Sequence, residues 1–362
     1  MSADFGTILR FTVFGESHGA AIGGILSGVP AGTEIDEEKI VFHMARRAPG
    51  KRGTTPRKEA DKVQFLSGVL NGKAEGSPIA FIIENTNTRS SDYEQHSFLA
   101  RPSHSDFPAF IKYKGFNDVR GGGHFSGRLT APLVTAGSIA RTMLERREVY
   151  IGAHLLKVGQ AEDEPFANPQ REELERLWNM PIPVQSIMPE RVEQQIRAAS
   201  EKGDSIGASV ECAVIGLPAG LGEPFFDSVE SVLSHMLFSI PGVKGVVFGD
   251  GERAAESCGS TFNDELYVNE SGKVQAKTNH AGGINGGITN GMPLIFKVFM
   301  RPTPSIFQAQ NTVDLKNGTN SLLRIQGRHD PCIALRAVPV IESVCAFVLC
   351  DFFMRNNALA IN

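Results

Sequence analysis

The side chains best suited to chemistry are concentrated in residues 120–128, with the sequence RGGGHFSGR. Four glycines let the backbone approach a ligand closely, and a hydroxyl, an imidazole and two guanidiniums stand among them. A helical pattern follows, for which Thr130 is the expected N-cap and Pro132 fits the first turn. A glycine-rich loop before a helix N-terminus favours negative charge. Taken alone, the stretch is either an anion-binding loop or a tight surface connection.

Arginines and histidines recur in at least five loops rich in glycine or proline. Arginine binds phosphate and carboxylate groups through two hydrogen bonds, and histidine exchanges protons near neutral pH. The residues are His18; Arg46, Arg47 and Arg52; Arg101 and His104; His124 and Arg128; and Arg328 and His329. Together they favour a site for a substrate with several anionic groups, with His18 and His104 as candidate proton donors.

Two of these loops also have simpler interpretations. Residues 46–58 carry six cations interrupted by proline and glycine, and such a run is either merely solvated or closes over a polyanionic small molecule. His104 lies two residues before Asp106, so it is either a general acid or a histidine of a turn.

Several common sites are excluded by their missing motifs. The chain has no G-x-x-x-x-G-K-[ST] phosphate loop and no G-x-G-x-x-G after a strand. These absences argue against a P-loop nucleotide site and a Rossmann dinucleotide site. No H-E-x-x-H is present either, and the histidines lie in separate loops, so no metal is expected.

Composition indicates a globular protein with an ample core. The chain has 362 residues, of which 41% are hydrophobic, and a net charge of −4, which argues against a nucleic-acid or membrane-surface role. Five cysteines without C-x-x-C spacing disfavour a disulfide framework and a zinc site. No signal peptide is visible, and the longest apolar run, residues 344–350, is too short to span a bilayer. We therefore expect a cytoplasmic protein without a membrane partner.

The pattern of elements predicts one α+β domain over residues 1–362, with mixed, mostly antiparallel strands. Polar residues 160–200 are expected to form a peripheral elaboration. Strands are predicted at residues 8–14, 24–29, 63–69, 78–84, 150–158, 208–216 and 293–300. Helices are predicted after an Asp36 cap, at 130–147, at 228–239 and, as a buried core helix, at about 339–353.

The loops, taken in order, resemble those of the chorismate synthase family. The similar stretches are residues 14–19, 47–55, 101–106, 120–130, 203–205, 243–246, 249–251, 279–283, 301–303 and 327–332. The resemblance implies helices sandwiched between antiparallel β-sheets, and a homotetramer. It also implies a lyase of the shikimate pathway that eliminates phosphate from 5-enolpyruvylshikimate 3-phosphate to give chorismate. The reaction would require reduced FMN (FMNH2) but would cause no net redox change. An external flavin reductase would supply the reduced flavin, and NADPH would be only an indirect source of reductant.

The resemblance also implies residue roles. His18 would protonate the leaving phosphate, His104 would stabilise charge on the flavin, and Asp330 would be an acid–base group near flavin N5. Substrate would be bound by Ser17, Arg47, Arg52, Arg101, Gly127, Arg128 and Arg328. FMN would be bound by His124, Phe125, Ser126, Pro241, Gly242, Gly286, Arg301, Pro302, Thr303, Pro304, Ser305 and Arg328.

Two positions depart from the commoner family pattern. His124 stands where arginine is usual, and the shorter basic loop leaves either Lys51 or Arg52 for the second cationic place. Two other functions remain open: an FMN-dependent oxidoreductase acting on a polyanionic substrate, and a non-catalytic RNA- or anion-binding module using residues 46–58. Net acidity and scattered cations count against nucleic acid, and the missing dinucleotide site counts against an ordinary oxidoreductase.

Overall fold

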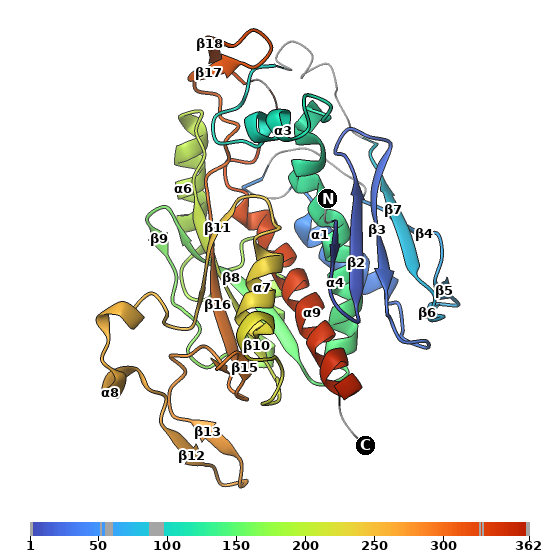
Figure 1. Ribbon diagram of the computed structural model, residues 1–362. Helices are drawn as coiled ribbons and strands as arrows, with labels where there is room; N and C mark the ends of the chain where they lie inside the picture. Colours follow the sequence, from blue (N-terminus) through green and yellow to red (C-terminus); the bar gives the residue numbers. More distant parts are fainter. Residues whose placement is uncertain are drawn as a thin grey trace.

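Two five-stranded antiparallel sheets face each other across a layer of helices (Figure 1). The computed structural model describes residues 3–50, 53–54, 61–86, 98–325, 327 and 329–359. The first sheet has the order β1 (Asp4–Phe5), β2 (Arg10–Gly15), β3 (Ala21–Ser27), β7 (Ile79–Glu84) and β4 (Val63–Phe65). The second has the order β11 (Val243–Phe248), β16 (Leu294–Met300), β10 (Ala208–Ile215), β8 (Tyr150–Val158) and β9 (Ala161–Glu162).

The second sheet is apolar on both faces, because each face is covered by helices. Successive side chains of a strand point to opposite faces. Accordingly Ile151 of β8 and Cys212 of β10 belong to the main core, whereas Ala213 packs with Leu174 and Leu177 of α5 (Arg171–Trp178) in a second cluster. The sheet therefore needs α5 on its outer face as well as the central helices.

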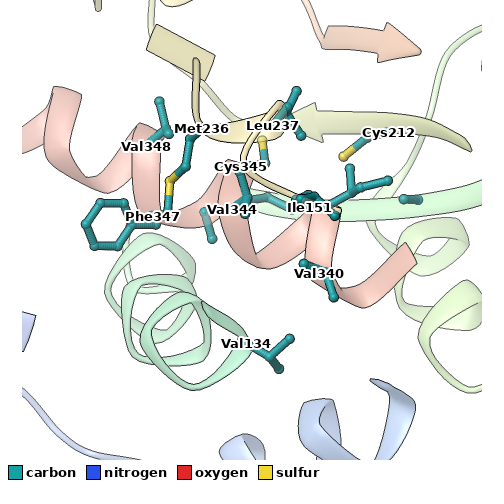
Figure 2. Close-up of a cluster of buried hydrophobic side chains, with 14 of the residues drawn as sticks. Val134, Ile151, Cys212, Met236, Leu237, Val340, Val344, Cys345, Phe347 and Val348 are labelled. Carbon is teal, nitrogen blue, oxygen red and sulfur yellow. The ribbon is translucent and has the colours of Figure 1, made fainter. Parts of the chain in front are cut away.

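Four helices form the central layer: α1 (Glu37–Arg47), α4 (Thr130–Glu145), α7 (Val229–Leu237) and α9 (Ala334–Leu359). Figure 2 shows how α9 contacts its neighbours. Val340, Val344 and Phe347 of α9 lie in one buried cluster with Val134 of α4, and Leu237 of α7 and Ile151 of β8 join it. The core is thus organised around α9.

Helix α9 is long and apolar enough to cross a membrane by composition, but 94% of its most apolar window is buried inside the fold. Such burial is typical of the core helix of a soluble protein. The predicted start near Pro339 is wrong, because the helix begins at Ala334 and contains Pro339. Proline is favoured in the first turn of a helix, but Pro339 lies five residues inside, where its ring removes one backbone donor.

The predicted helix caps had mixed outcomes. Asp36 caps α1 as expected, accepting a hydrogen bond from the Lys39 amide at 2.9 Å. Thr130 is instead the first residue of α4, and Leu129 precedes it as a cap without a side-chain hydrogen bond. The Thr130 hydroxyl donates to the Gly127 carbonyl at 2.6 Å and accepts from Arg47 Nε at 2.9 Å. The side chain that looked like a cap therefore binds an arginine.

The predicted strand 150–158 coincides with β8, and the strands predicted at 78–84, 208–216 and 293–300 agree with β7, β10 and β16 to within a residue at each end. The strand predicted at 63–69 is interrupted: β4 ends at Phe65, and β5 begins at Val69. A glycine at position 68 with φ of 80° bends the chain between them.

The remaining elements connect or border the sandwich, and α8 with its neighbouring hairpin projects from the body in Figure 1. Residues 160–200 form α5 and most of α6 (Pro189–Glu201), which pack on the second sheet. That this segment is a peripheral elaboration stays a prediction. The other helices are α3 (Asp106–Lys112), η1 (Arg120–Phe125), η2 (Gly127–Leu129), α6 (Pro189–Glu201), η3 (Phe225–Asp227), η4 (Ala254–Glu256) and α8 (Gly259–Phe262). The other hairpins are β5–β6 (Val69–Leu70, Lys73–Ala74), β12–β13 (Leu266–Val268, Val274–Ala276), β14–β15 (Ile284–Asn285, Ile288–Thr289) and β17–β18 (Gln310–Asp314, Thr319–Leu323).

Candidate active site

A cavity of about 700 Å³ lies where the polar loops converge. Its wall includes five arginines and two aspartates, so anionic ligands are favoured there although the whole chain has a net charge of −4. The predicted site residues in this wall are Ser17, His18, Arg47, Arg101, His104, His124, Phe125, Ser126, Gly127, Arg128, Pro241, Gly242, Arg301, Thr303, Pro304, Ser305 and Asp330. Loops from both halves of the chain thus contribute to one site.

The glycine-rich loop lies between the two candidate histidines. Gly121, Gly122 and Gly123 all have positive φ, at 59°, 88° and 52°. A Cβ on Gly121 would be 2.2 Å from His18 Cε1, and one on Gly122 would be 3.4 Å from His104 Cε1. Because no side chain would fit at the first of these positions, glycine permits the contact with His18.

His104 is bound by an acid that also binds an arginine. Its Nδ1 is 2.7 Å from Asp106 Oδ1, and Arg101 donates to both oxygens of the same carboxylate, from Nε at 2.7 Å and from Nη2 at 2.8 Å. Burial raises the pKa of Asp106, but the hydrogen bonds from Arg101 and His104 outweigh burial and hold that pKa well below its usual value. Asp106 is therefore ionised and accepts the proton on Nδ1, which leaves Nε2 as the acceptor in the neutral ring.

Burial also lowers the pKa of His104, and the positive charge of Arg101 adds to this effect, while the hydrogen bond to Asp106 opposes it. His104 is consequently neutral at pH 7 in the protein alone. An anion bound beside the ring would favour the protonated form and raise that pKa.

His18 has a serine as its neighbour. Its Nδ1 is 3.1 Å from Ser17 Oγ, and that hydroxyl donates to the Arg120 carbonyl at 3.2 Å. The backbone amide of Ser17 donates to the Gly123 carbonyl at 3.2 Å. The turn after β2 and the glycine-rich loop therefore hold each other, and with them the imidazole.

Arg47 and Arg128 are joined by one buried carboxylate, that of Asp61. Arg47 Nη1 donates to Asp61 Oδ2 at 2.9 Å, and Arg128 Nη1 donates to Asp61 Oδ1. Arg47 reaches this position from the last turn of α1, and Arg128 from η2. Asp61 was not predicted from the sequence, because an acid in a polar loop gives no local signal of its two distant partners.

Asp330 lies against a second residue that was not predicted, Arg336. Arg336 Nη1 donates to Asp330 Oδ2 at 2.6 Å, and its Nε donates to the Arg47 carbonyl at 3.0 Å. Thr303 Oγ1 donates to the Asp330 backbone carbonyl at 2.9 Å. A usable sequence signal was the arginine itself, a permanent charge in the first turn of a mostly apolar helix.

His329 lies in the same wall but was assigned no role. Its Nε2 is buried and has no hydrogen-bond partner among the described residues. Burial, aided by the positive charge of Arg101, lowers the pKa of His329 to about 4. The ring is therefore neutral at neutral pH, and its buried nitrogen is a potential contact for a ligand or for the neighbouring loop.

The residues predicted for FMN suit a flat ring with polar edges and a phosphate. The cavity combines hydroxyl and cationic groups of Ser126, Thr303, Ser305 and Arg301 with apolar walls. The apolar residues are Phe5, Phe11, Val13, Leu133, Met236, Ile240, Ile333 and Val340. His124 Nδ1 donates to the Gly15 carbonyl at 3.1 Å, so this unusual residue also connects the glycine-rich loop to the end of β2.

Some predicted residues lie elsewhere. Gly286 is in the β14–β15 turn and Pro302 lies between two residues of the wall, and neither belongs to the lining found among the described residues. Lys51, Arg52 and Arg328 lie outside the described residues. Within the part of the chain that the structure describes, no group of three or more histidine, cysteine, aspartate or glutamate side chains could hold a metal ion.

Comparisons with known proteins show to which family this chain belongs. A family model described as chorismate synthase matches residues 9–354. A chorismate synthase of Chitinophaga pinensis is 46% identical over 98% of this chain and 97% of the relative, and one of Thermococcus gammatolerans is 44% identical over 98% of each chain. A crystal structure of a chorismate synthase superposes with a TM-score of 0.75 at 30% identity, covering 97% of this chain and 93% of the other. These similarities confirm the predicted fold class, and the chain belongs to the chorismate synthase family, whose members are lyases.

Proposed function

We propose that this chain converts 5-enolpyruvylshikimate 3-phosphate to chorismate and phosphate, using reduced FMN without net redox change. The observation that carries the proposal is the convergence on one cavity of His18, His104, Asp330 and five arginines from separate segments of the chain. The substrate carries a phosphate and two carboxylates, and arginine is the side chain best suited to such groups. Family membership supports the same reaction, the last common step of aromatic amino-acid biosynthesis.

Different residues of the cavity wall would carry out different parts of a 1,4-elimination. In this reaction the ring loses a hydrogen and the phosphate, and a second ring double bond forms. Arg47, Arg101 and Arg128 bind the anionic groups and orient them. His18, supported by Ser17, donates a proton to the departing phosphate oxygen, since a protonated phosphate is the better leaving group.

His104 and Asp330 act on the cofactor side. Asp106 fixes the tautomer of His104, so the imidazole can take a proton at Nε2 and stabilise nearby negative charge. Arg336 holds the Asp330 carboxylate in place as the acid–base group. Ser126, Arg301, Thr303 and Ser305 would hold the FMN. The chemistry expected of bound reduced FMN is a transient donation of an electron, which an allylic C–H of low acidity requires.

The same proposal includes a homotetramer in the cytosol that obtains reduced flavin from an external reductase. Light scattering would then give four times the mass of one chain. The proposal follows from family membership alone, because one chain is described here.

The proposal is tested by incubating the purified protein anaerobically with the enolpyruvyl phosphate and chemically reduced FMN. Phosphate and chorismate should form in equal amounts. A protein that forms neither lacks the proposed activity, and oxidation of one flavin per turnover would instead indicate an oxidoreductase.

A further inference from the structure

The carboxylate of Asp61 lies behind the cavity wall, between two arginines that are far apart in sequence. Its side chain is 3% exposed, and those of Arg47 and Arg128 are 2% and 7% exposed. Both arginines also line the cavity. A guanidinium is the side chain best suited to a phosphate or a carboxylate. The cavity side of this arginine pair therefore suits an oxyanion of a ligand.

Each arginine is also held by neutral acceptors on the protein. Arg47 donates to Thr130 Oγ1 at 2.9 Å and to the Gly127 carbonyl at 3.1 Å. Arg128 donates to Asn85 Oδ1 at 3.0 Å and to the Glu84 carbonyl at 3.3 Å. These contacts come from different elements for the two arginines, whereas Asp61 contacts both. Among the described residues, its carboxylate is accordingly the direct link between the two guanidiniums.

The backbone at Asp61 is unusual. Its φ is +42°, a conformation that costs most L residues energy and that aspartate and asparagine tolerate better than others. A left-handed residue just before β4 turns this carboxylate inward beneath the arginines. The strain is consistent with a requirement for the side chain at that point.

We propose that Asp61 is a positioning residue of the substrate pocket, whose carboxylate sets the spacing of Arg47 and Arg128 so that both bind one oxyanion, phosphate or carboxylate, of the substrate. This inference rests on the proposed function, in which the two arginines bind that substrate. A similar arrangement occurs at Asp106, whose carboxylate binds Arg101 and His104, two other residues of the cavity wall.

The variant Asp61→Asn separates positioning from charge. It removes the negative charge, so an effect of charge alone would tighten anion binding. Asparagine keeps the shape and the tolerance of positive φ, but its amide presents N–H donors to one guanidinium. If Asp61 positions the pair, that arginine loses its acceptor and binding weakens at least about ten-fold, the value of a lost charge-assisted hydrogen bond.

The experiment measures the dissociation constant of 5-enolpyruvylshikimate 3-phosphate by calorimetry without flavin, and kcat and KM in the assay with reduced FMN. Asp61→Asn should raise the dissociation constant and KM together by about ten-fold or more, with kcat within a few-fold of wild type. A merely structural role would lower the active fraction and leave KM unchanged. Asp61→Glu keeps the charge but displaces it by one methylene, and should weaken binding several-fold.

Glu342→Gln is the matched control. Glu342 is buried between Arg46 and Arg141, with contacts of 2.5 Å and 3.0 Å, and is not part of the cavity wall found among the described residues. It should lower stability without changing the dissociation constant. The inference is overturned if an Asp61 variant folds and binds the substrate as tightly as the wild type or more tightly. The proposed function is untouched by that result as long as the wild-type protein converts the substrate. A wild-type protein that neither binds nor converts the substrate overturns the proposed function, and the inference with it.

Discussion

His18 and His104 flank the glycine-rich loop, and their partners suit them to different tasks. His18 has a hydroxyl beside it, whereas His104 has an ionised carboxylate and lies beside the charge of Arg101. The neutral hydroxyl of Ser17 contacts His18 Nδ1, whereas the charged carboxylate of Asp106 fixes the orientation of His104.

Replacement of either histidine by alanine should therefore lower kcat by about ten- to ten-thousand-fold, the usual contribution of a general acid or base. The measurement is the initial rate of phosphate release at saturating substrate. His280→Ala is a suitable control, because His280 makes a similar 2.7 Å contact with Asp250 away from the cavity. Wild-type rates in the His18 and His104 variants would make them ordinary turn histidines.

His329 gives a prediction about pH. Burial lowers its pKa to about 4 in the folded protein, against about 6.5 in the unfolded chain. Below pH 6.5 the unfolded chain binds the extra proton, so stability is present above that pH and is lost as the pH falls towards 4. Between pH 7 and pH 4 the wild type should lose up to about 3 kcal/mol more than His329→Asn. Urea denaturation at several pH values measures this difference, and parallel curves for the two proteins would contradict it.

Most of the site residues predicted from the resemblance lie in the cavity wall, although they make up less than half of its lining among the described residues. Asp61, Arg336 and the environment of His329 could not be predicted in the same way. Their roles depend on partners from distant segments, such as the contact between Arg336 and the Arg47 carbonyl, 289 residues apart. A single sequence gives the type of a charged residue but not the partner with which it pairs.

At the level of elements, the close approach of α4 and α9 determines how the site is assembled. A Cβ on Gly137 of α4 would lie 2.4 Å from both Cβ and the carbonyl oxygen of Ser343 on α9. The N-terminal end of α4 follows Arg128, and that of α9 carries Arg336. Separating these helices would consequently move two arginines of the cavity wall.

Gly137→Ala should destabilise the fold by about 1–3 kcal/mol, because overpacking outweighs the gain of up to about 1 kcal/mol in helix propensity. It should also lower kcat. Chemical denaturation measures the change in the free energy of unfolding. Gly259→Ala in α8 is the control, since its Cβ would meet nothing closer than 3.9 Å, and it should change stability by less than about 0.5 kcal/mol. An equally small effect at Gly137 would show that the helices can separate at little cost.

Elements with a clear hydrophobic period or a capping side chain could be predicted from the sequence. Element ends that depend on tertiary contacts could not. Strand β8 and the Asp36 cap depend on local sequence and agree with the prediction. The Thr130 cap and the start of α9 were wrong, because a distant arginine binds the Thr130 hydroxyl and because the helix tolerates Pro339 in its interior. Local propensity cannot anticipate either outcome.

At the level of the whole molecule, an acidic chain concentrates cations in one cavity between its two halves. Composition argued against a nucleic-acid or membrane-surface role, since the net charge is −4. The fold reconciles this charge with an anionic substrate, because the arginines that line the cavity come from separate segments. The predicted layered fold is confirmed by the structural match to a chorismate synthase, whereas the reaction and the cofactor remain proposals.

The central claim is an elimination that needs reduced FMN but does not consume it, and a count of turnovers per flavin tests it most directly. Under strict anaerobiosis, with substrate in large excess over FMN, phosphate and chorismate are quantified while the flavin spectrum is followed. The account predicts equal amounts of both products, many per flavin, with the flavin still reduced when the substrate is exhausted. Product formation that stops at one per flavin, with the flavin oxidised, would contradict it.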